Sequence, residues 1–112
     1  MSRFTCSQDR LVVYLEGEID HHAARYLRTQ IEEMIQRTKA AHLILDFSGV
    51  GFIDSSGIGM IIGRYKTMRS RQGKMSARGL NAAADRLFHM AGLHRIIPIE
   101  AAKEETKEEM KA

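Results

Sequence analysis

The short apolar run HLILDF at residues 42–47 constrains the fold of this chain more than any other feature. A strand covered on both faces has such a nearly continuous apolar sequence, whereas a half-exposed strand alternates between apolar and polar residues. The run lies between two segments with helical spacing, and strands that alternate with helices are typical of a mainly parallel or mixed sheet with covering helices. We therefore predict an α/β fold in which residues 42–47 form the central strand.

Caps, turns and the spacing of apolar residues predict the other elements. Asp20 can cap a helix in which apolar residues recur along one stripe, and Gly73 and Gly92 are suitable helix ends. The predicted elements are a hairpin of strands at 4–7 and 11–15, a helix from Asp20 to about Arg37, the central strand, a loop at 48–51, a helix from about Ser56 to Arg71, a strand at 75–78, a helix from Asn81 to Met90, an edge strand at 96–99 and a frayed helix at 101–112.

Length and composition predict one folded, soluble domain. A chain of 112 residues can build one modest hydrophobic core and is too short for two. Hydrophobic residues make up 44% and charged residues 28%, which is close to globular averages and far from the composition of disordered chains. We expect a single domain over residues 1–112, with a compact core at about 4–100 and a charged C-terminal helix or tail at 101–112.

Neither a membrane segment nor a disulfide is predicted. The apolar stretches are far shorter than the roughly 18 residues that cross a bilayer, and the N-terminus lacks the apolar core of a secretory signal. The single cysteine, Cys6, can form no internal disulfide and has no His or Cys nearby at the spacing of metal ligands. We expect a cytoplasmic protein that binds neither membranes nor a metal.

The net charge of +3 raises the question of nucleic-acid binding, so the position of the basic residues matters. The basic excess is concentrated between Arg64 and Arg78. That segment lacks the interleaved aromatic pattern that stacks on bases and matches no helix-turn-helix or zinc-finger pattern. We interpret it as a solvated helix face and expect no direct contact with nucleic acid; the alternative is a surface that attracts an acidic partner.

The segment DSSGIG at residues 54–59 combines two hydroxyls, a carboxylate and two glycines at a predicted helix start. One interpretation is structural: Ser55 or Ser56 is the helix N-cap, worth about 1 kcal/mol, or Asp54 is a loop carboxylate that caps the same helix. The functional interpretation is that Ser55 is phosphorylated, which adds roughly −1.5 to −2 charges where free N–H groups at the helix start can bind them. The fold would tolerate that phosphate, whereas a partner fitted to a neutral hydroxyl would not.

The two glycines of this segment need a separate explanation. Gly57 and Gly59 each cost the helix up to about 1 kcal/mol relative to alanine. Their presence indicates the close approach of another group. That group is either a neighbouring strand or a partner, and the sequence favours neither.

Three stretches of the sequence resemble one known family. The main one is VGFIDSSGIG at residues 50–59, followed by RYK at 64–66, and the others are GEIDHH at 17–22 and RLFHMAGL at 86–93. On these motifs the chain resembles the STAS domain family, the bacterial anti-sigma factor antagonists, and is most similar to its sporulation members that act on sigma F. The similarity covers roughly residues 4–100.

The resemblance implies a fold and a regulatory cycle. The fold would be a mixed four- to five-stranded sheet with about four helices packed mainly on one side. The unphosphorylated protein would bind an anti-sigma factor that is also a serine kinase, release the sigma factor and so permit sporulation transcription. The kinase would then phosphorylate the antagonist and dissociate, and a PP2C-type serine phosphatase would reset the switch. ATP belongs to the kinase in this cycle, so no cofactor and no enzymatic activity are expected of this chain.

The resemblance also implies roles for individual residues. Ser55 matches the phosphoacceptor, because it is the serine directly after the motif's aspartate, and Ser56 is the less favoured acceptor. Asp20 matches an aspartate that helps to contact the kinase, a role compatible with its predicted one as a helix cap. The remaining motif residues would shape the docking loop: Asp54, Ser56, Gly57 and Gly59.

Other classes of function are weakly supported. A hydrolase using Ser55 as nucleophile would need a base and an oxyanion hole, and Ile53 stands where a nucleophile elbow has glycine. The pair His21–His22 has no third metal ligand, and no phosphate-binding glycine motif is present. A scaffold domain of a stress-signalling assembly would share the fold and the motif. We expect a monomer, although the predicted edge strands could support dimers.

Overall fold

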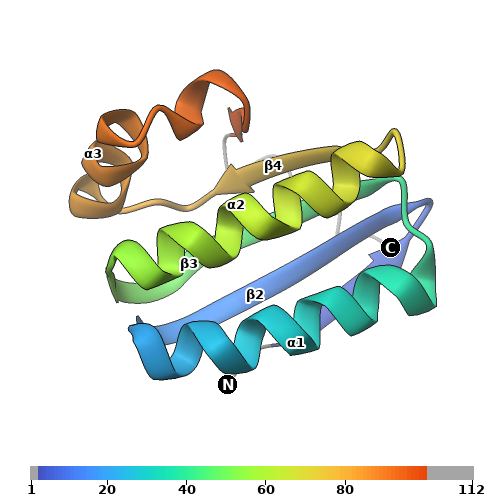
Figure 1. Ribbon diagram of the computed structural model, residues 1–112, viewed down its shortest axis with the longest axis horizontal. Helices are drawn as coiled ribbons and strands as arrows, with labels where there is room; N and C mark the ends of the chain where they lie inside the picture. Colours follow the sequence, from blue (N-terminus) through green and yellow to red (C-terminus); the bar gives the residue numbers. More distant parts are fainter. Residues whose placement is uncertain (1–2, 101–112) are drawn as a thin grey trace.

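The computed structural model describes residues 3–100, so the helix predicted at 101–112 lies outside the described residues. Figure 1 shows the elements in chain order. They are β1 (Arg3–Ser7), β2 (Arg10–Ile19), α1 (His21–Thr38), β3 (His42–Ile53), α2 (Ser55–Ser70), β4 (Lys74–Arg78), α3 (Ala82–Met90), a 3₁₀ helix η1 (Leu93–Arg95) and β5 (Ile99–Glu100).

The five strands form one mixed sheet in the order β1-β2-β3-β4-β5. β1 pairs antiparallel with β2, and all the other neighbours are parallel. Leu45 of β3 lies between Val13 of β2 and Ala77 of β4, and all three side chains are buried. The predicted α/β class, the mixed sheet and the central strand are therefore confirmed, with three α-helices among the described residues instead of the expected four or so.

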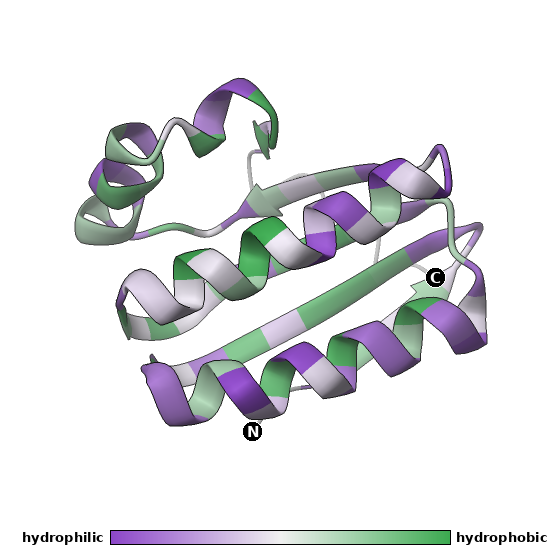
Figure 2. Cartoon of the chain, in the orientation of Figure 1, coloured by the Kyte–Doolittle hydropathy of each residue, from purple (hydrophilic) through white to green (hydrophobic). Residues whose placement is uncertain are grey.

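The helices build one hydrophobic core against the sheet. In Figure 1, α1 and α2 run side by side across the sheet. Helix α3 adds Phe88, whose ring packs edge-on against Phe47 of β3 with centroids 5.8 Å apart. Figure 2 shows β2 as hydrophobic through most of its middle, while α1 alternates between hydrophobic and hydrophilic turns. That alternation reflects the predicted apolar stripe of α1, whose buried members are Ala24, Leu27, Ile31 and Ile35.

The predicted loop at 48–51 is wrong, because β3 continues through it to Ile53. β2 also runs past Gly17 to Ile19, and the two strands stay paired as far as Ile19 and Ile53, with register shifts on the way. Gly49 allows the strands to approach closely, since a Cβ there would lie 3.0 Å from the backbone oxygen of Leu15. The glycines that suggested a loop are thus part of an irregular strand.

The predicted edge strand at 96–99 is also mostly wrong. The chain forms the turn of η1 first, with the Ile97 N–H donating to the Leu93 oxygen, and Ile97 is fully buried. It joins the sheet only at its end, where the Pro98 oxygen accepts from Ala77 and β5 covers Ile99 and Glu100. A two-residue edge strand beside a proline is consistent with the lost ladder donor.

Candidate functional site

The candidate site lies where β2 and β3 end beside each other. The parallel pairing of Ile19 with Ile53 brings the two following loops together, and the Asp54 N–H donates to the Ile19 oxygen at 3.2 Å. Each strand is followed by an aspartate and then by a helix, so the N-terminal ends of α1 and α2 face the same edge of the sheet. Asp20 and Ser55 therefore lie at the same edge of the sheet.

Both aspartates cap their helices. Asp20 accepts a hydrogen bond from the Ala23 N–H at 2.9 Å, as predicted. Asp54 Oδ1 accepts from the N–H groups of Ser56 at 2.9 Å and Gly57 at 3.1 Å. Asp54 is therefore the N-cap of α2, and the interpretation of Ser55 or Ser56 as that cap is wrong.

The two serines have different surroundings. Ser55 is the first residue of α2, it is exposed, and its hydroxyl makes no hydrogen bond within residues 3–100. Ser56 is half-buried, and its hydroxyl oxygen lies 3.3 Å from Nδ1 of His21 on α1. The Ser55 hydroxyl is thus available to another molecule and does not cap the helix.

A phosphate on Ser55 would meet a different environment from the predicted one. The sequence predicts that free N–H groups at the helix start bind this phosphate, but Asp54 already accepts from two N–H groups of the first turn. The phosphate would therefore stand beside a carboxylate that is held in place by hydrogen bonds. The modification would concentrate negative charge at the surface instead of neutralising the helix dipole.

The structure separates the two glycines of the motif. A Cβ on Gly57 would lie 2.5 Å from Cγ1 of Ile53 and 3.0 Å from Cγ2 of Ile19, so the strand ends require a glycine there. A Cβ on Gly59 would come within 4 Å of no other packed group among residues 3–100. The neighbouring strands thus explain Gly57, and nothing in the described part of the chain explains Gly59.

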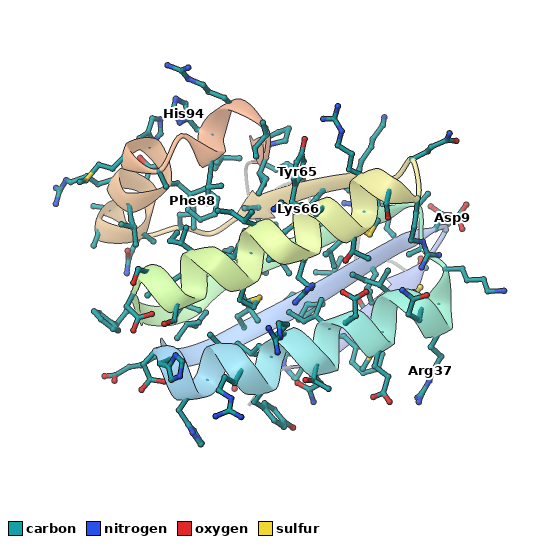
Figure 3. The ribbon with its side chains drawn as sticks, in the orientation of Figure 1. Asp9, Arg37, Tyr65, Lys66, Phe88 and His94 are labelled. Atoms are coloured by element: carbon teal, nitrogen blue, oxygen red, sulfur yellow. The ribbon has the colours of Figure 1, made fainter. Side chains whose placement is uncertain are left out.

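The basic segment between Arg64 and Arg78 is only in part the predicted solvated face. Lys66 is exposed on α2 (Figure 3), but Arg64 is only 8% exposed and its Nε lies 2.9 Å from Oε1 of Glu32 on α1. Arg78 is on a strand, has 0% exposure and pairs with Asp46 at 2.8 Å. The interpretation was wrong for these two arginines, because sequence spacing does not reveal buried carboxylate partners.

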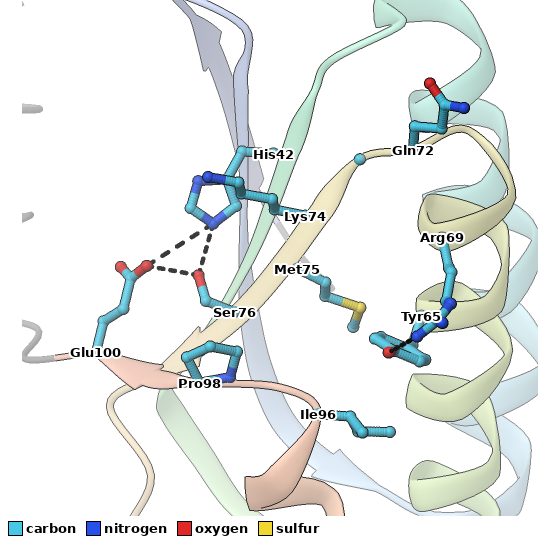
Figure 4. A pocket seen from close by; sticks show the side chains of 11 residues that line it. His42, Tyr65, Arg69, Gln72, Lys74, Met75, Ser76, Ile96, Pro98 and Glu100 are labelled. Carbon is cyan, nitrogen blue, oxygen red and sulfur yellow. Dashed lines mark hydrogen bonds and ion pairs between the residues drawn. The ribbon is translucent and has the colours of Figure 1, made fainter.

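A second polar cluster, which the sequence did not indicate, lies in a cavity of about 760 Å³ bordered by the C-terminal half of α2 (Figure 4). Ser76 donates to Oε2 of Glu100 at 2.7 Å, and Nε2 of His42 lies 2.8 Å from the same serine oxygen. The carboxylate approaches the same ring nitrogen as the serine, at 3.7 Å, so it does not orient the imidazole as in a nucleophilic triad. No described group of three acidic, His or Cys side chains could hold a metal ion.

His42 is expected to make stability depend on pH. Burial lowers its pKa below 6.5; the charge of Glu100 opposes this, and Arg10 and Lys74 add to it. The unfolded chain then binds more protons between the folded-state pKa and 6.5, so stability is lost as pH falls through that window. Urea unfolding at about pH 7.5 and about pH 5.5 should show a smaller loss for His42→Gln than for wild type. The control His22→Gln changes an exposed histidine and should behave as wild type; equal losses in all three proteins would contradict the expectation.

Comparison with known proteins gives consistent matches. The family model described as the STAS domain matches residues 3–106. The chain is 43% identical over 89 residues to the anti-sigma F factor antagonist of Paenibacillus polymyxa, covering 80% of this chain and 76% of that protein. It is 33% identical over 91 residues to the anti-sigma-B factor antagonist of Listeria monocytogenes, covering 81% of this chain and 79% of that protein.

Solved structures share the fold. The anti-sigma factor antagonist SpoIIAA in its unphosphorylated form superposes with a TM-score of 0.81 at 23% identity, covering 100% of this chain and 98% of that one. The Bacillus cell fate determinant SpoIIAA in the phosphorylated form gives a TM-score of 0.75 at 24% identity, covering 96% of this chain and 98% of that one. At these sequence identities, the two structures support the fold of this chain and nothing further.

Proposed function

The chain belongs to the STAS domain family, and we propose that it is an anti-sigma factor antagonist whose binding is switched by phosphorylation of Ser55. The unphosphorylated form binds an anti-sigma factor serine kinase and releases the sigma factor. The kinase transfers phosphate to Ser55 and dissociates, and a PP2C-type serine phosphatase restores the hydroxyl. The chain itself performs no catalytic step in this cycle.

The hydroxyl of Ser55, which is exposed and makes no hydrogen bond to any described residue, carries this proposal. A serine at a helix start usually caps the helix, but here Asp54 does so and leaves Ser55 at the surface. The hydroxyl sits at the end of a helix whose first turn lies close to the ends of two strands, at Ile19 and Ile53. An enzyme could therefore reach Ser55 without unfolding the domain.

Electrostatics explains why phosphorylation would end binding. The Asp54 carboxylate is adjacent in sequence, and Asp20 caps the helix that follows the neighbouring strand end. A phosphate adds roughly −1.5 to −2 charges to this surface. A partner fitted to the neutral hydroxyl would have to desolvate that charge or place its own acidic groups against it, and both are unfavourable.

The relatives named for sigma F support sigma F as the proposed target, and sporulation stays the process implied by the sequence resemblance. The 43% identity to a protein named for sigma F exceeds the 33% identity to one named for sigma B. The sigma-B names leave the target open between the two sigma factors. The alternative to an antagonist that the sequence leaves open is a scaffold component of a stress-signalling assembly. Sedimentation distinguishes the two: a monomer that binds an anti-sigma factor fits the antagonist, and a stable high-order assembly fits the scaffold.

The proposed compartment is the cytoplasm, where the kinase, the phosphatase and the transcription machinery would be accessible. Within residues 3–100, no helix has the length and apolar character needed to cross a membrane. The single cysteine, Cys6, is exposed and free. A reducing compartment suits such a thiol.

The test is to incubate the protein with a cognate anti-sigma kinase and ATP and to map phosphate by mass spectrometry. Phosphate is expected on Ser55 and is expected to be absent from Ser55→Ala, which should still bind the kinase. Ser55→Asp should weaken binding at least about tenfold, because it places a second carboxylate beside Asp54.

The control Ser70→Asp adds the same charge at the other end of α2, where Ser70 is also exposed, and should bind as wild type. Phosphate on Ser56 alone would mean that Ser56, and not Ser55, is the phosphorylated residue of the switch. Unchanged binding of Ser55→Asp together with unmodified serines would refute the proposed switch.

A further inference from the structure

A cleft of about 250 Å³ lies between α1 and α2, and its lining includes Ser56, the residue that follows the candidate phosphoacceptor. Its basic side chains come from one face of α1, since residues four and seven positions after His21 follow it along the helix. We call it the basic cleft. Its lining is His21, Ala24, Arg25 and Arg28 from α1 and Ser56, Gly59 and Met60 from α2.

The two arginines of the basic cleft have no acidic partner in direct contact among the described residues. No acidic side chain lines it, and the side chains of Arg25 and Arg28 form no ion pair or hydrogen bond within residues 3–100. Farther along the same two helices the situation is different, because Arg64 of α2 pairs with Glu32 of α1 and Thr67 donates to that carboxylate at 3.0 Å. Near the middle of the two helices a basic side chain thus pairs with an acidic one, whereas near Ser56 the described residues offer Arg25 and Arg28 no such partner.

Gly59 gives the basic cleft an open floor on the α2 side. The residue is exposed and helical, and a Cβ there would meet no atom within 4 Å. Glycine at such a position lowers helix stability relative to alanine, and packing within the described chain does not require it. An approaching side chain from another molecule would benefit from the missing Cβ.

We propose that the basic cleft receives an acidic side chain of the anti-sigma factor when the unphosphorylated protein binds. This inference rests on the proposed function and names a contact of the same interface. The cleft complements a carboxylate in charge, and Ser56 in its wall is the direct neighbour of Ser55. A phosphate on Ser55 would carry the same sign of charge as the incoming carboxylate, so the two would repel each other and compete for the same cations.

The first test compares Arg25→Glu with Arg37→Glu. Both residues are exposed on α1 and both substitutions change the net charge equally, but Arg37 projects from the opposite end of the helix (Figure 3). Affinity for the cognate anti-sigma factor, measured by calorimetry at low and high salt, should fall about tenfold or more for Arg25→Glu, with a weaker salt dependence. Arg37→Glu should bind as wild type.

The second test is Gly59→Ala, which adds one methyl group to the floor of the cleft. It should raise the melting temperature of the free protein and weaken binding, a combination that loss of folding cannot produce. If Arg25→Glu binds as Arg37→Glu does and Gly59→Ala binds as wild type, while Ser55→Asp still fails to bind, the inference is overturned and the proposed function stands.

Two further outcomes would also be decisive. No binding of wild type to any anti-sigma factor would remove the proposed function and this inference together. Arg25→Glu could also bind normally and have a lower melting temperature than wild type only when both proteins are phosphorylated. That result would show that the cleft holds the phosphate of the same chain, and it would overturn the inference.

Discussion

Replacing Arg78 with methionine is expected to lower the free energy of unfolding by about 3–5 kcal/mol. Arg78 is completely buried, and its Nε donates to Oδ2 of Asp46 at 2.8 Å while Asp46 is only 5% exposed. Removal of the guanidinium leaves a buried carboxylate without its cation, and desolvation of such a charge is costly. The pair joins β3 to β4, so it supports the strand that leads to the candidate site.

The pH dependence of this loss has a definite sign. Burial raises the pKa of Asp46, but hydrogen bonds from Arg78 and Ser48 outweigh it, so the pKa lies below 3.8 in the wild type. The wild-type carboxylate therefore stabilises the fold above that value, and this contribution is lost as pH falls through the folded-state pKa. Without Arg78 the Asp46 pKa rises and the group can be neutral when buried. The difference between Arg78→Met and wild type should therefore shrink from about pH 7 to about pH 4.

Urea unfolding followed by circular dichroism measures this difference. The matched control is Arg64→Met, which breaks an ion pair whose Glu32 partner is 35% exposed and can return to water, so a loss of only about 1 kcal/mol is expected. The double substitution of Asp46→Leu with Arg78→Met should recover much of the stability, because no charge remains buried. A loss below about 1 kcal/mol for Arg78→Met alone would contradict this account of the pair.

The second large effect is expected for Gly57→Ala, which should destabilise the protein by about 2 kcal/mol. The new Cβ would lie 2.5 Å from Cγ1 of Ile53 and 3.1 Å from the backbone oxygen of Ile19, and β-branched side chains at paired strand ends have little room to move. The clash outweighs the gain of up to about 1 kcal/mol in helix propensity. The start of α2 would shift away from the sheet, and slower phosphorylation of Ser55 is expected as well.

Gly59→Ala is the natural control, because it makes the same chemical change two residues later in the same helix. It should increase the free energy of unfolding by up to about 1 kcal/mol, since its Cβ would lie within 4 Å of no heavy atom of the described residues outside its own helix turn. Chemical denaturation of both variants therefore should give effects of opposite sign. Equal effects would mean that the start of α2 is not packed as tightly as described.

Predictions from the sequence succeeded where the signal is local. The apolar run at 42–47, the stripe of α1 and the cap Asp20 all depend on residues within a few positions of one another. Predictions failed where the partner is distant in sequence. The glycine-rich residues 48–51 became strand because β2 pairs with them, and Arg78 is buried because Asp46 lies on the neighbouring strand.

The candidate site also combines features that local sequence predicts with contacts that it does not predict. The sequence alone singled out Asp20 as a helix cap, and it singled out the DSSGIG segment because two hydroxyls, a carboxylate and two glycines at one helix start are an unusual combination. It could not decide which residue caps α2, which glycine the strands require, or that Arg25 and Arg28 face Ser56 across a cleft. Local composition and spacing determine which elements form, whereas contacts between distant segments, made only when the chain folds, decide what each side chain meets.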